Sequence, residues 1–414
     1  VWDKSTGTFV VNGLTHTLST VNNYVTWIEM ASRPDSNQIA LMAVDLDADA
    51  VALIWNGDTN SWGNEKKLNS SALNSTTEKQ IAVSYMLSGN YRNRAVFAWA
   101  ETNDVYSWTW SGAAWAPSNT SATDAATGNI YWMKIAADPN SHNLLLAVED
   151  TGNDIFTVPW TGNGWGTART IETSAYGSYL NFPPFDVVFE SGSGHEGHAL
   201  IVYSDTSYIR YQHTTDITGT WGSETLLTSS YIYNWIELAD NADGTIHLVG
   251  QDYYLSTYDY LVAYTWNNTS WTLEGTLETA VSKDTSATYQ SWALTAKPPT
   301  PASGGGGGGG DTTGTMLGYS VASTSNAYYS NWDGADWPNG TSGPSFNTNL
   351  YQVVVKSNTV RNEKIMLGVS NTDTHLYAAI WDGSSWTDGE GGGSGSSKDL
   401  GAVQSASYRC FDAA

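Results

Sequence analysis

The sequence predicts an all-β fold, a β-propeller of four-stranded antiparallel blades, and three observations support this. A short phrase with two tryptophans around a small polar turn recurs with a period near 50 residues. Each copy follows two runs in which apolar residues alternate with polar ones, and a further short apolar run lies upstream. No segment combines a 3.6-residue apolar period with helix caps. Four strands recurring at this spacing are typical of a propeller blade.

The recurring phrase is clearest as WDGADW at 332–337 and WDGSSW at 381–386. With degenerate copies at 2–9 and 211–221, eight copies begin at the following aromatic residues: Trp2, Trp55, Trp110, Trp160, Tyr211, Trp266, Trp332 and Trp381. Aromatic side chains that face each other across the base of a hairpin stabilise the strand pair. We therefore interpret each copy as the hairpin between strands C and D of a blade, and most of these tryptophans as architecture.

The two runs before each phrase predict strands B and C. In AVFAWAETNDVYSWTW, at 95–110, apolar residues occupy every second position and an acidic and amide turn interrupts them, which is a hairpin signal. The upstream run predicts strand A of each blade. Strand A is expected at 27–31, 80–85, 131–136, 185–189, 235–239, 292–296 and 351–355.

These strands divide the chain into seven full blades within a single propeller spanning 1–414. The blades are expected at 27–77, 78–128, 129–177, 178–229, 230–284, 285–349 and 350–400. Residues 1–14 supply only a C to D hairpin and residues 408–414 only an A strand. Propellers commonly close by combining strands from both ends of the chain. Eight blades are therefore preferred, with seven as the alternative, and the missing B strand predicts that the chain continues beyond both ends.

Composition excludes several classes of partner. The chain has 41 Asp and Glu against 17 Lys and Arg, a net charge of −24, so it repels nucleic-acid phosphate and anionic lipid. No stretch of about 18 apolar residues is present, so no membrane insertion is expected. The single cysteine, Cys410, excludes an intrachain disulfide. High acidity and loops rich in Thr, Ser and Asn favour an extracellular or cell-surface location.

The segment HLYAAIWDGSSWT, at 375–387, resembles the blade phrase of fucose-binding lectin propellers, and NGDTNSW at 56–62 is loosely similar to the Asp-box of sialidase-type propellers. The lectin resemblance implies sugar binding by stacking on an indole, with nearby Asp or Asn taking the hydroxyls. Its candidate carbohydrate-binding residues are Trp332, Asp333, Trp337, Trp381, Asp382 and Trp386. That family also holds its sugar with an Arg and a Glu, whereas the seven arginines here do not recur at one blade position.

Two patterns suggest metal ligands. Asp45, Asp47 and Asp49, in DLDAD, offer oxygen ligands that would suit calcium, the one cofactor considered, although Asp also favours tight turns through bonds to local N–H groups. His195 and His198, in HEGH, lie in a glycine-rich stretch with no third ligand nearby in sequence. That pattern favours a loop over a metal site.

No catalytic set with a fixed spacing recurs, so we expect a non-enzymatic protein. The first hypothesis is an extracellular or cell-surface scaffold for adhesion or assembly, including a surface fibre in which a neighbouring copy supplies the missing strand. The alternative is a lectin-like carbohydrate-binding propeller, and the second alternative is a glycoside hydrolase on the same fold. The expected partners are accordingly glycans or further copies of the chain.

Overall fold

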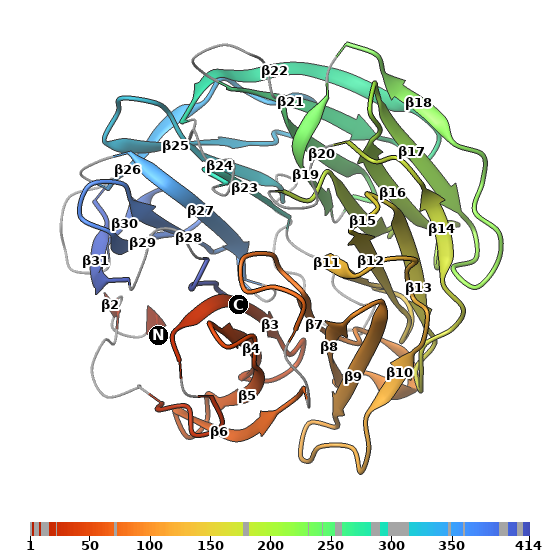
Figure 1. Cartoon of the computed structure of the whole chain (residues 1–414). Coiled ribbons are helices and arrows are strands. Elements are labelled where there is room, and N and C mark those ends of the chain that lie inside the picture. The colour runs from red at the N-terminus through yellow and green to blue at the C-terminus, as the bar shows by residue number, and fades with distance from the viewer. Residues whose placement is uncertain are drawn as a thin grey trace. The chain divides into compact units, whose positions relative to one another are not determined.

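In the computed structural model, the described residues form β-strands and one short 3-10 helix, joined by turns and loops (Figure 1). The residues it describes are 2–3, 8–9, 16–21, 23–69, 73–176, 182–230, 232–241, 243–252, 259–282, 290–296, 314–346, 349–358, 361–388, 396–403 and 409–414. The chain divides into two compact units. Residues 16–238 form one, here the 16–238 unit, and residues 239–414 form the other together with residues 1–15, here the 239–414 unit.

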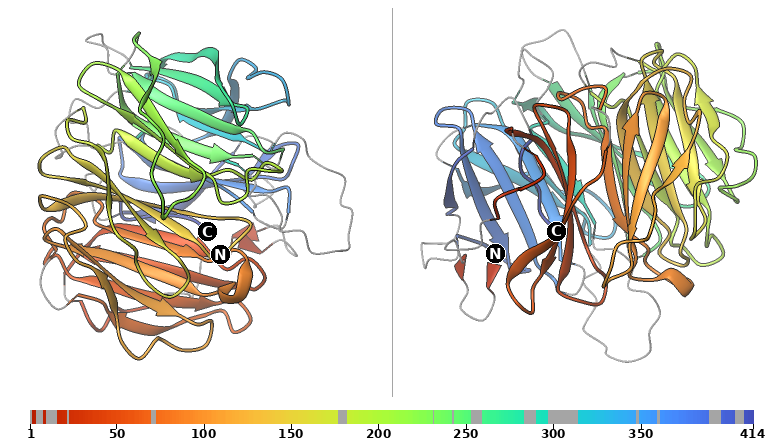
Figure 2. Two further views of the ribbon diagram at one scale, coloured as in Figure 1. Left: turned by 90° about the vertical axis from the view of Figure 1, so that its right-hand side faces the viewer. Right: turned by 60° about the horizontal axis from the view of Figure 1, so that its bottom comes forward.

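The 16–238 unit contains four antiparallel sheets of four strands, numbered here as blades one to four (Figures 1 and 2). Blade one has β3 (Val25–Ser32), β4 (Gln38–Asp45), β5 (Ala50–Asn56) and β6 (Ser61–Lys67). Blade two has β7 (Ile81–Tyr85), β8 (Ala95–Glu101), β9 (Asp104–Trp110) and β10 (Thr120–Ala122), with a short 3-10 helix, η1 (Gly89–Tyr91), between its first two strands. Blade three has β11 (Ile130–Ala137), β12 (Leu144–Asp150), β13 (Ile155–Trp160) and β14 (Arg169–Glu172). Blade four has β15 (Phe185–Phe189), β16 (Ala199–Ser204), β17 (Ile209–Thr214) and β18 (Thr225–Thr228).

The 239–414 unit contains the remaining blades, and β19 (Tyr233–Asp240) begins in the 16–238 unit and ends in this one. Blade five continues with β20 (Ile246–Asp252), β21 (Asp259–Trp266) and β22 (Trp271–Val281). Blade six has β23 (Trp292–Thr295), β24 (Met316–Ser320), β25 (Asn326–Asn331) and β26 (Thr341–Ser345). Blade seven has β27 (Leu350–Ser357), β28 (Lys364–Ser370), β29 (His375–Trp381) and β30 (Trp386–Thr387), and β31 (Lys398–Ala402) also pairs with β29.

The fold is therefore a β-propeller of four-stranded antiparallel blades, as predicted. Seven such blades lie within the described residues, so the preferred count of eight is wrong and the alternative of seven is confirmed. The N-terminal segment forms only a two-stranded hairpin, β1 (Trp2–Asp3) and β2 (Thr8–Phe9). Phe9 packs with Phe411 and Ala413 against blade seven, so the two ends of the chain do meet. The described parts of these ends contain only β1 and β2, and not the four strands of a further blade. Tyr408, the expected start of the last strand, lies outside the described residues.

The inner strands of the blades are buried on both faces. Every residue of β12 is buried, and every residue of β16 likewise. Neighbouring blades pack face to face, as in the cluster of blades two and three that contains Ala98, Val105 and Met133. A strand covered on both faces is apolar nearly throughout, whereas the outer strand of a blade, such as β6, keeps exposed polar residues.

The tryptophan hairpins join successive blades. In the 16–238 unit the indole nitrogen of Trp115, in blade two, donates to the Asn64 carbonyl of blade one at 3.0 Å. The indole nitrogen of Trp165, in blade three, donates to the Ser107 hydroxyl of blade two at 2.9 Å. In the 239–414 unit the Trp381 ring lies 5.2 Å from that of Tyr329 in blade six. The hairpins of blades two, three and seven thus carry contacts within their own blade and to the preceding one.

No helix among the described residues has the length and apolar character needed to cross a membrane.

Candidate functional site: the cleft between blades one and two

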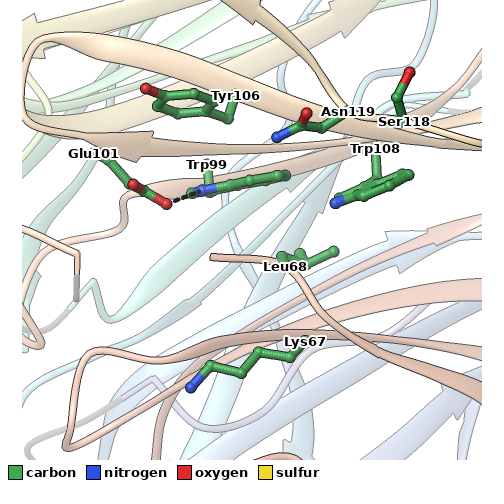
Figure 3. Close-up of a pocket in the computed structure, with 8 residues that line it drawn as sticks. All are labelled: Lys67, Leu68, Trp99, Glu101, Tyr106, Trp108, Ser118 and Asn119. Atoms are coloured by element: carbon green, nitrogen blue, oxygen red, sulfur yellow. Dashed lines mark hydrogen bonds between the residues drawn. The ribbon is translucent and has the colours of Figure 1, made fainter. Parts of the chain in front are cut away.

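A cleft of about 310 Å³ opens between blades one and two, within the 16–238 unit (Figure 3). Its lining combines aromatic rings, one carboxylate, an amide, a hydroxyl and an ammonium group. The lining residues are Lys67, Leu68, Trp99, Glu101, Tyr106, Trp108, Ser118 and Asn119. Lys67 and Leu68 come from the end of blade one, and the other six from blade two (Figure 3).

The β8–β9 hairpin positions the aromatic side chains. Trp99 and Tyr106 are register partners across the hairpin, and their rings stack with centroids 5.8 Å apart at an interplanar angle of 21°. Because side chains two residues apart share a face of a strand, Glu101 lies beside Trp99 and Trp108 beside Tyr106. The Trp99 indole nitrogen donates to Glu101 Oε1 at 2.9 Å, which holds the carboxylate at the cleft wall (Figure 3).

The turn of this hairpin is held by Asn74. Thr102 adopts a left-handed conformation with φ of 59°, as the first residue of a two-residue turn requires. The Asn74 amide donates to the Thr102 carbonyl at 2.9 Å, and the Thr102 N–H donates to Asn74 Oδ1 at 3.0 Å. Glu101, the residue before the turn, is thereby held on a rigid support.

The rings of the cleft differ in accessibility. Trp99 is 1% exposed and forms the floor, whereas Tyr106 and Trp108 are half-buried. The Lys66 ammonium lies 3.7 Å from the centroid of the Trp108 ring, a cation–π contact on one face. Lys67 is engaged as well, since its ammonium lies 2.6 Å from Asp49 Oδ2. Tyr106 and Trp108 therefore supply the aromatic surface that a ligand can touch.

The Tyr106 phenol stays protonated at neutral pH. Burial, and then the negative charges of Asp104 and Glu101, raise its pKa. Its hydroxyl donates to Asp104 Oδ2 at 3.3 Å. The cleft thus presents neutral aromatic rings next to an acceptor, Glu101, and the amide of Asn119. Such a wall suits a polyhydroxylated ligand that has an apolar C–H face.

The six residues that sequence analysis assigned to carbohydrate binding lie elsewhere and serve the hairpins. Trp332, Trp337, Trp381 and Trp386 are buried, with the two rings of each pair 5.8 and 5.6 Å apart. Asp333 accepts the N–H groups of Ala335 and Asp336, both at 2.9 Å, and Asp382 accepts those of Ser384 and Ser385, both at 2.8 Å. The acidic residues therefore close the turns, and the indole faces are covered by protein.

The calcium candidates also form a turn. Asp45 is buried, and its Oδ1 accepts the N–H groups of Asp47 at 2.9 Å and Asp49 at 3.0 Å. Asp47 accepts the Asn23 amide at 3.2 Å, and Asp49 is paired with Lys67. Oxygens that calcium would use thus have partners from the turn itself and from Asn23 and Lys67 outside it.

The histidine pair is joined by ligands that sequence spacing did not indicate. His195 and His198 converge with Glu190 into a group whose ligand atoms all lie within 4.8 Å of one another. His213 Nε2 lies 3.2 Å from the same Glu190 oxygen. His195 and His198 lie in a loop between β15 and β16, as the sequence indicated, but side chains distant in sequence or on another strand join them there.

The positions of the cleft residues recur in blade four with different chemistry. Residues 199–214 align without a gap on 95–110, so Tyr203 and Arg210 are register partners just as Trp99 and Tyr106 are. Arg210 pairs with Asp205 at 2.6 Å and with Glu224 at 3.1 Å. An aromatic residue, an Arg and a Glu, the set that the lectin resemblance calls for, therefore meet in this blade, where they bond to one another.

None of the residues that line the cleft was among the carbohydrate-binding candidates predicted from the sequence. One usable signal was that Trp99 and Trp108 stand outside the repeating tryptophan phrase, at positions where blade four has Tyr203 and Gln212. Aromatic residues that break a repeat are better site candidates than those that make it.

Among the comparisons with known proteins, likeness to one solved lectin structure agrees with this fold. No family model matches the sequence, and no curated protein matches it. Among solved structures, the BP39L lectin from Burkholderia pseudomallei is similar with a TM-score of 0.61 and 12% identity, covering 90% of this chain and 99% of that one. A lectin of Aleuria aurantia, described as a six-bladed β-propeller, has a TM-score of 0.44 at 11% identity over 92% and 97% of the two chains. An α-L-arabinofuranosidase of Fusarium graminearum has 0.42 at 11% over 84% and 88%.

Proposed function

We propose that this protein is a carbohydrate-binding β-propeller that holds a sugar ring in the cleft between blades one and two. The observation that carries the proposal is the lining of that cleft, in which Tyr106 and Trp108 stand next to Glu101 and Asn119. The likeness in fold to the Burkholderia pseudomallei lectin supports it. The alternative function predicted from the sequence thus becomes the preferred one.

The dimensions of the cleft suit a small ligand. Its volume of about 310 Å³ is at the lower end of the range for small-molecule sites, about 300 to 1,000 Å³. This room suits the terminal ring of a glycan better than an extended chain. An aromatic face contacts the C–H face of the ring, Glu101 accepts hydrogen bonds from two neighbouring hydroxyls, and the Asn119 amide donates to a third.

Binding without hydrolysis is the expected outcome at this cleft. Glycoside hydrolysis in most families uses two carboxyl groups that flank the scissile bond. The lining residues include one carboxylate, Glu101, which is engaged by the Trp99 indole. We therefore propose a binding protein, and release of sugar from an oligosaccharide by the wild-type protein would contradict this.

The proposed setting is extracellular or at a cell surface, where glycans are presented. The net charge of −24 keeps the protein away from anionic surfaces and directs it to neutral sugars. A scaffold for adhesion, the first hypothesis from the sequence, is compatible with glycan binding. Assembly into a fibre takes second place, because the cleft offers a specific site for a small ligand.

The test is a glycan array followed by calorimetric titration of the best ligand. Trp108→Ala and Glu101→Gln should each weaken binding at least about tenfold, because one removes the aromatic surface and the other a charged acceptor. Tyr24→Ala is the matched control, since Tyr24 is 61% exposed and lies outside the cleft, and should bind as the wild type does. An array without saturable binding, or full affinity in Trp108→Ala, would overturn the proposal.

A further inference from the structure

Four ionisable side chains converge in blade four, away from the cleft. Glu190 directly follows β15, and His195 and His198 lie in the loop between β15 and β16. His213 belongs to β17, where it is the register partner of Leu200. The loop is closed by the Glu190 N–H, which donates to the His198 carbonyl at 3.0 Å. Backbone pairing therefore brings the four side chains to the same end of the blade.

The three imidazoles surround one carboxylate oxygen. Glu190 Oε2 lies 3.1 Å from His195 Nδ1, 3.3 Å from His198 Nδ1 and 3.2 Å from His213 Nε2. The rings of His195 and His198 meet at 78°, and those of His198 and His213 at 73°. The imidazoles thus approach the carboxylate from different directions instead of stacking.

One imidazole nitrogen of this cluster, His198 Nδ1, has no aligned hydrogen bond. Each carboxylate oxygen has two lone pairs, and His195 and His213 are placed to bond to those of Oε2. His198 Nδ1 is the third nitrogen at this oxygen, and it is buried without an aligned hydrogen bond. The Glu190 side chain is fully buried, and a buried carboxylate needs a positive charge beside it. A cation within the cluster would serve both groups at once.

We propose that Glu190, His195, His198 and His213 form a binding site for a divalent transition-metal ion of the zinc type. Zinc binds imidazole nitrogen and carboxylate oxygen at about 2.0 to 2.2 Å, almost always in tetrahedral geometry when the site is structural. The ligand atoms of such a tetrahedron are about 3.3 to 3.5 Å apart, since an edge is about 1.6 times the bond length. The three distances to Glu190 Oε2, 3.1 to 3.3 Å, are close to three of those edges, and the ligand atoms of Glu190, His195 and His198 all lie within 4.8 Å of one another. Small side-chain movements would therefore complete a tetrahedron.

The ligand set selects the class of ion. Imidazole suits zinc, copper and nickel, whereas calcium and magnesium take oxygen ligands. The three histidine side chains are each 19% to 28% exposed, which leaves a path for the ion to enter. Bound there, the ion links the β15–β16 loop to β17 and stabilises blade four.

The experiment measures zinc uptake by the full chain after treatment with a chelator. We expect one tightly bound Zn²⁺ per chain, a rise in melting temperature on zinc addition, and a visible Co²⁺ spectrum of tetrahedral type. His195→Ala/His198→Ala, two half-buried loop positions, should weaken zinc binding by at least about a hundredfold, because loss of an outer-shell partner alone costs 10- to 100-fold. His213→Ala removes one of the four ligands and should weaken zinc binding by at least about tenfold, less than the double variant does.

The matched control is His375→Ala, because His375 also faces a carboxylate, Asp399 at 2.8 Å, but lies in blade seven. It should take up zinc as the wild type does. Wild-type protein that binds no more zinc than the double variant would overturn the proposal, and so would equal loss in His375→Ala. Circular dichroism of each variant verifies folding, and zinc binding by the wild type tests the proposal even if a variant unfolds.

Discussion

Aromatic side chains have different surroundings in the C to D hairpins and in the cleft. The first tryptophan of each pair, from Trp55 to Trp381, is between 1% and 8% exposed, and the two rings of a pair lie 5.0 to 5.8 Å apart. Tyr106 and Trp108 are half-buried and face the cleft. The first tryptophans of the repeating phrase are buried and build the blades, whereas Tyr106 and Trp108, which lie outside that phrase, line the cleft.

Truncation of a hairpin tryptophan should have the largest effect on stability. Trp381 is buried in the core of blade seven. Its ring centroid lies 5.2 Å from that of Tyr329 and 5.6 Å from that of Trp386. Trp381→Ala leaves a cavity that these neighbours cannot fill, so it should lower the free energy of unfolding by about 3 to 5 kcal/mol. Chemical denaturation monitored by tryptophan fluorescence measures this. A loss below about 1 kcal/mol would mean that the pair does not hold the blade together.

His247, which is buried against the tryptophan pair of blade six, should make the free energy of unfolding depend on pH. His247 lies between Trp332 and Trp337, with ring centroids 4.6 and 5.3 Å away. Burial lowers the pKa of His247 to about 4, although Asp243 opposes the shift. The unfolded chain, with a pKa near 6.5, therefore binds a proton that the folded chain does not. The free energy of unfolding should fall as pH drops from 6.5 to 4, by up to about 3 kcal/mol.

His247→Gln isolates this contribution, because the variant keeps a polar side chain without the titration. The difference in stability between wild type and variant should change with pH only in that window. His375→Gln is an informative contrast, since the hydrogen bond to Asp399 raises the pKa of His375. The contribution of His375 to the free energy of unfolding therefore changes with pH in the opposite direction. Its stabilising effect is present at low pH and is lost as pH rises through the folded pKa. Parallel stability curves for wild type and His247→Gln from pH 4 to 7 would refute the prediction.

Truncation of an aromatic residue in the cleft should reduce glycan binding strongly and stability only slightly, unlike truncation of a hairpin tryptophan. Trp108→Ala removes a half-buried ring and the cation–π contact of Lys66, so we expect the free energy of unfolding to fall by only about 1 to 2 kcal/mol. The same change should weaken glycan binding at least about tenfold. Denaturation and calorimetric titration of one preparation compare the two effects. A stability loss as large as that of Trp381→Ala would place Trp108 among the architectural tryptophans.

Local patterns were sufficient to predict the strands, but not which blades form the site. The apolar pattern and the turn residues at 95–110 predicted β8 and β9, since both are local properties of the sequence; β8 is buried at all but its last residue, whereas β9 begins with alternating burial. The cleft joins Lys67 and Leu68 of one blade to Trp99 and Asn119 of the next, and such adjacency follows from how blades pack. Sequence spacing holds no information on that packing.

The same limit explains the metal ligands and the blade count. HEGH placed His195 and His198 together, but Glu190 and His213 join them only through the pairing of β15, β16 and β17. The preference for eight blades followed from the two terminal segments, which do pack together through Phe9 and Phe411. Their meeting was predicted correctly, whereas the hydrogen-bonded strands needed for a further blade are not present among the described residues.

The smallest expected effect concerns how the hairpin tryptophans join neighbouring blades in the 16–238 unit. The Trp165 indole nitrogen donates to the buried Ser107 hydroxyl at 2.9 Å, which links blade three to blade two. In a double-mutant cycle, Trp165→Phe and Ser107→Ala should show a coupling of about 1 kcal/mol, the net value of one hydrogen bond.

Trp115 provides the matched control, because its nitrogen donates to the Asn64 carbonyl and not to Ser107. Trp115→Phe and Ser107→Ala should therefore be additive to within about 0.3 kcal/mol. Equal coupling in both cycles would show that Ser107→Ala acts through repacking of blade two, and the hydrogen bond between the blades would then have no separate contribution.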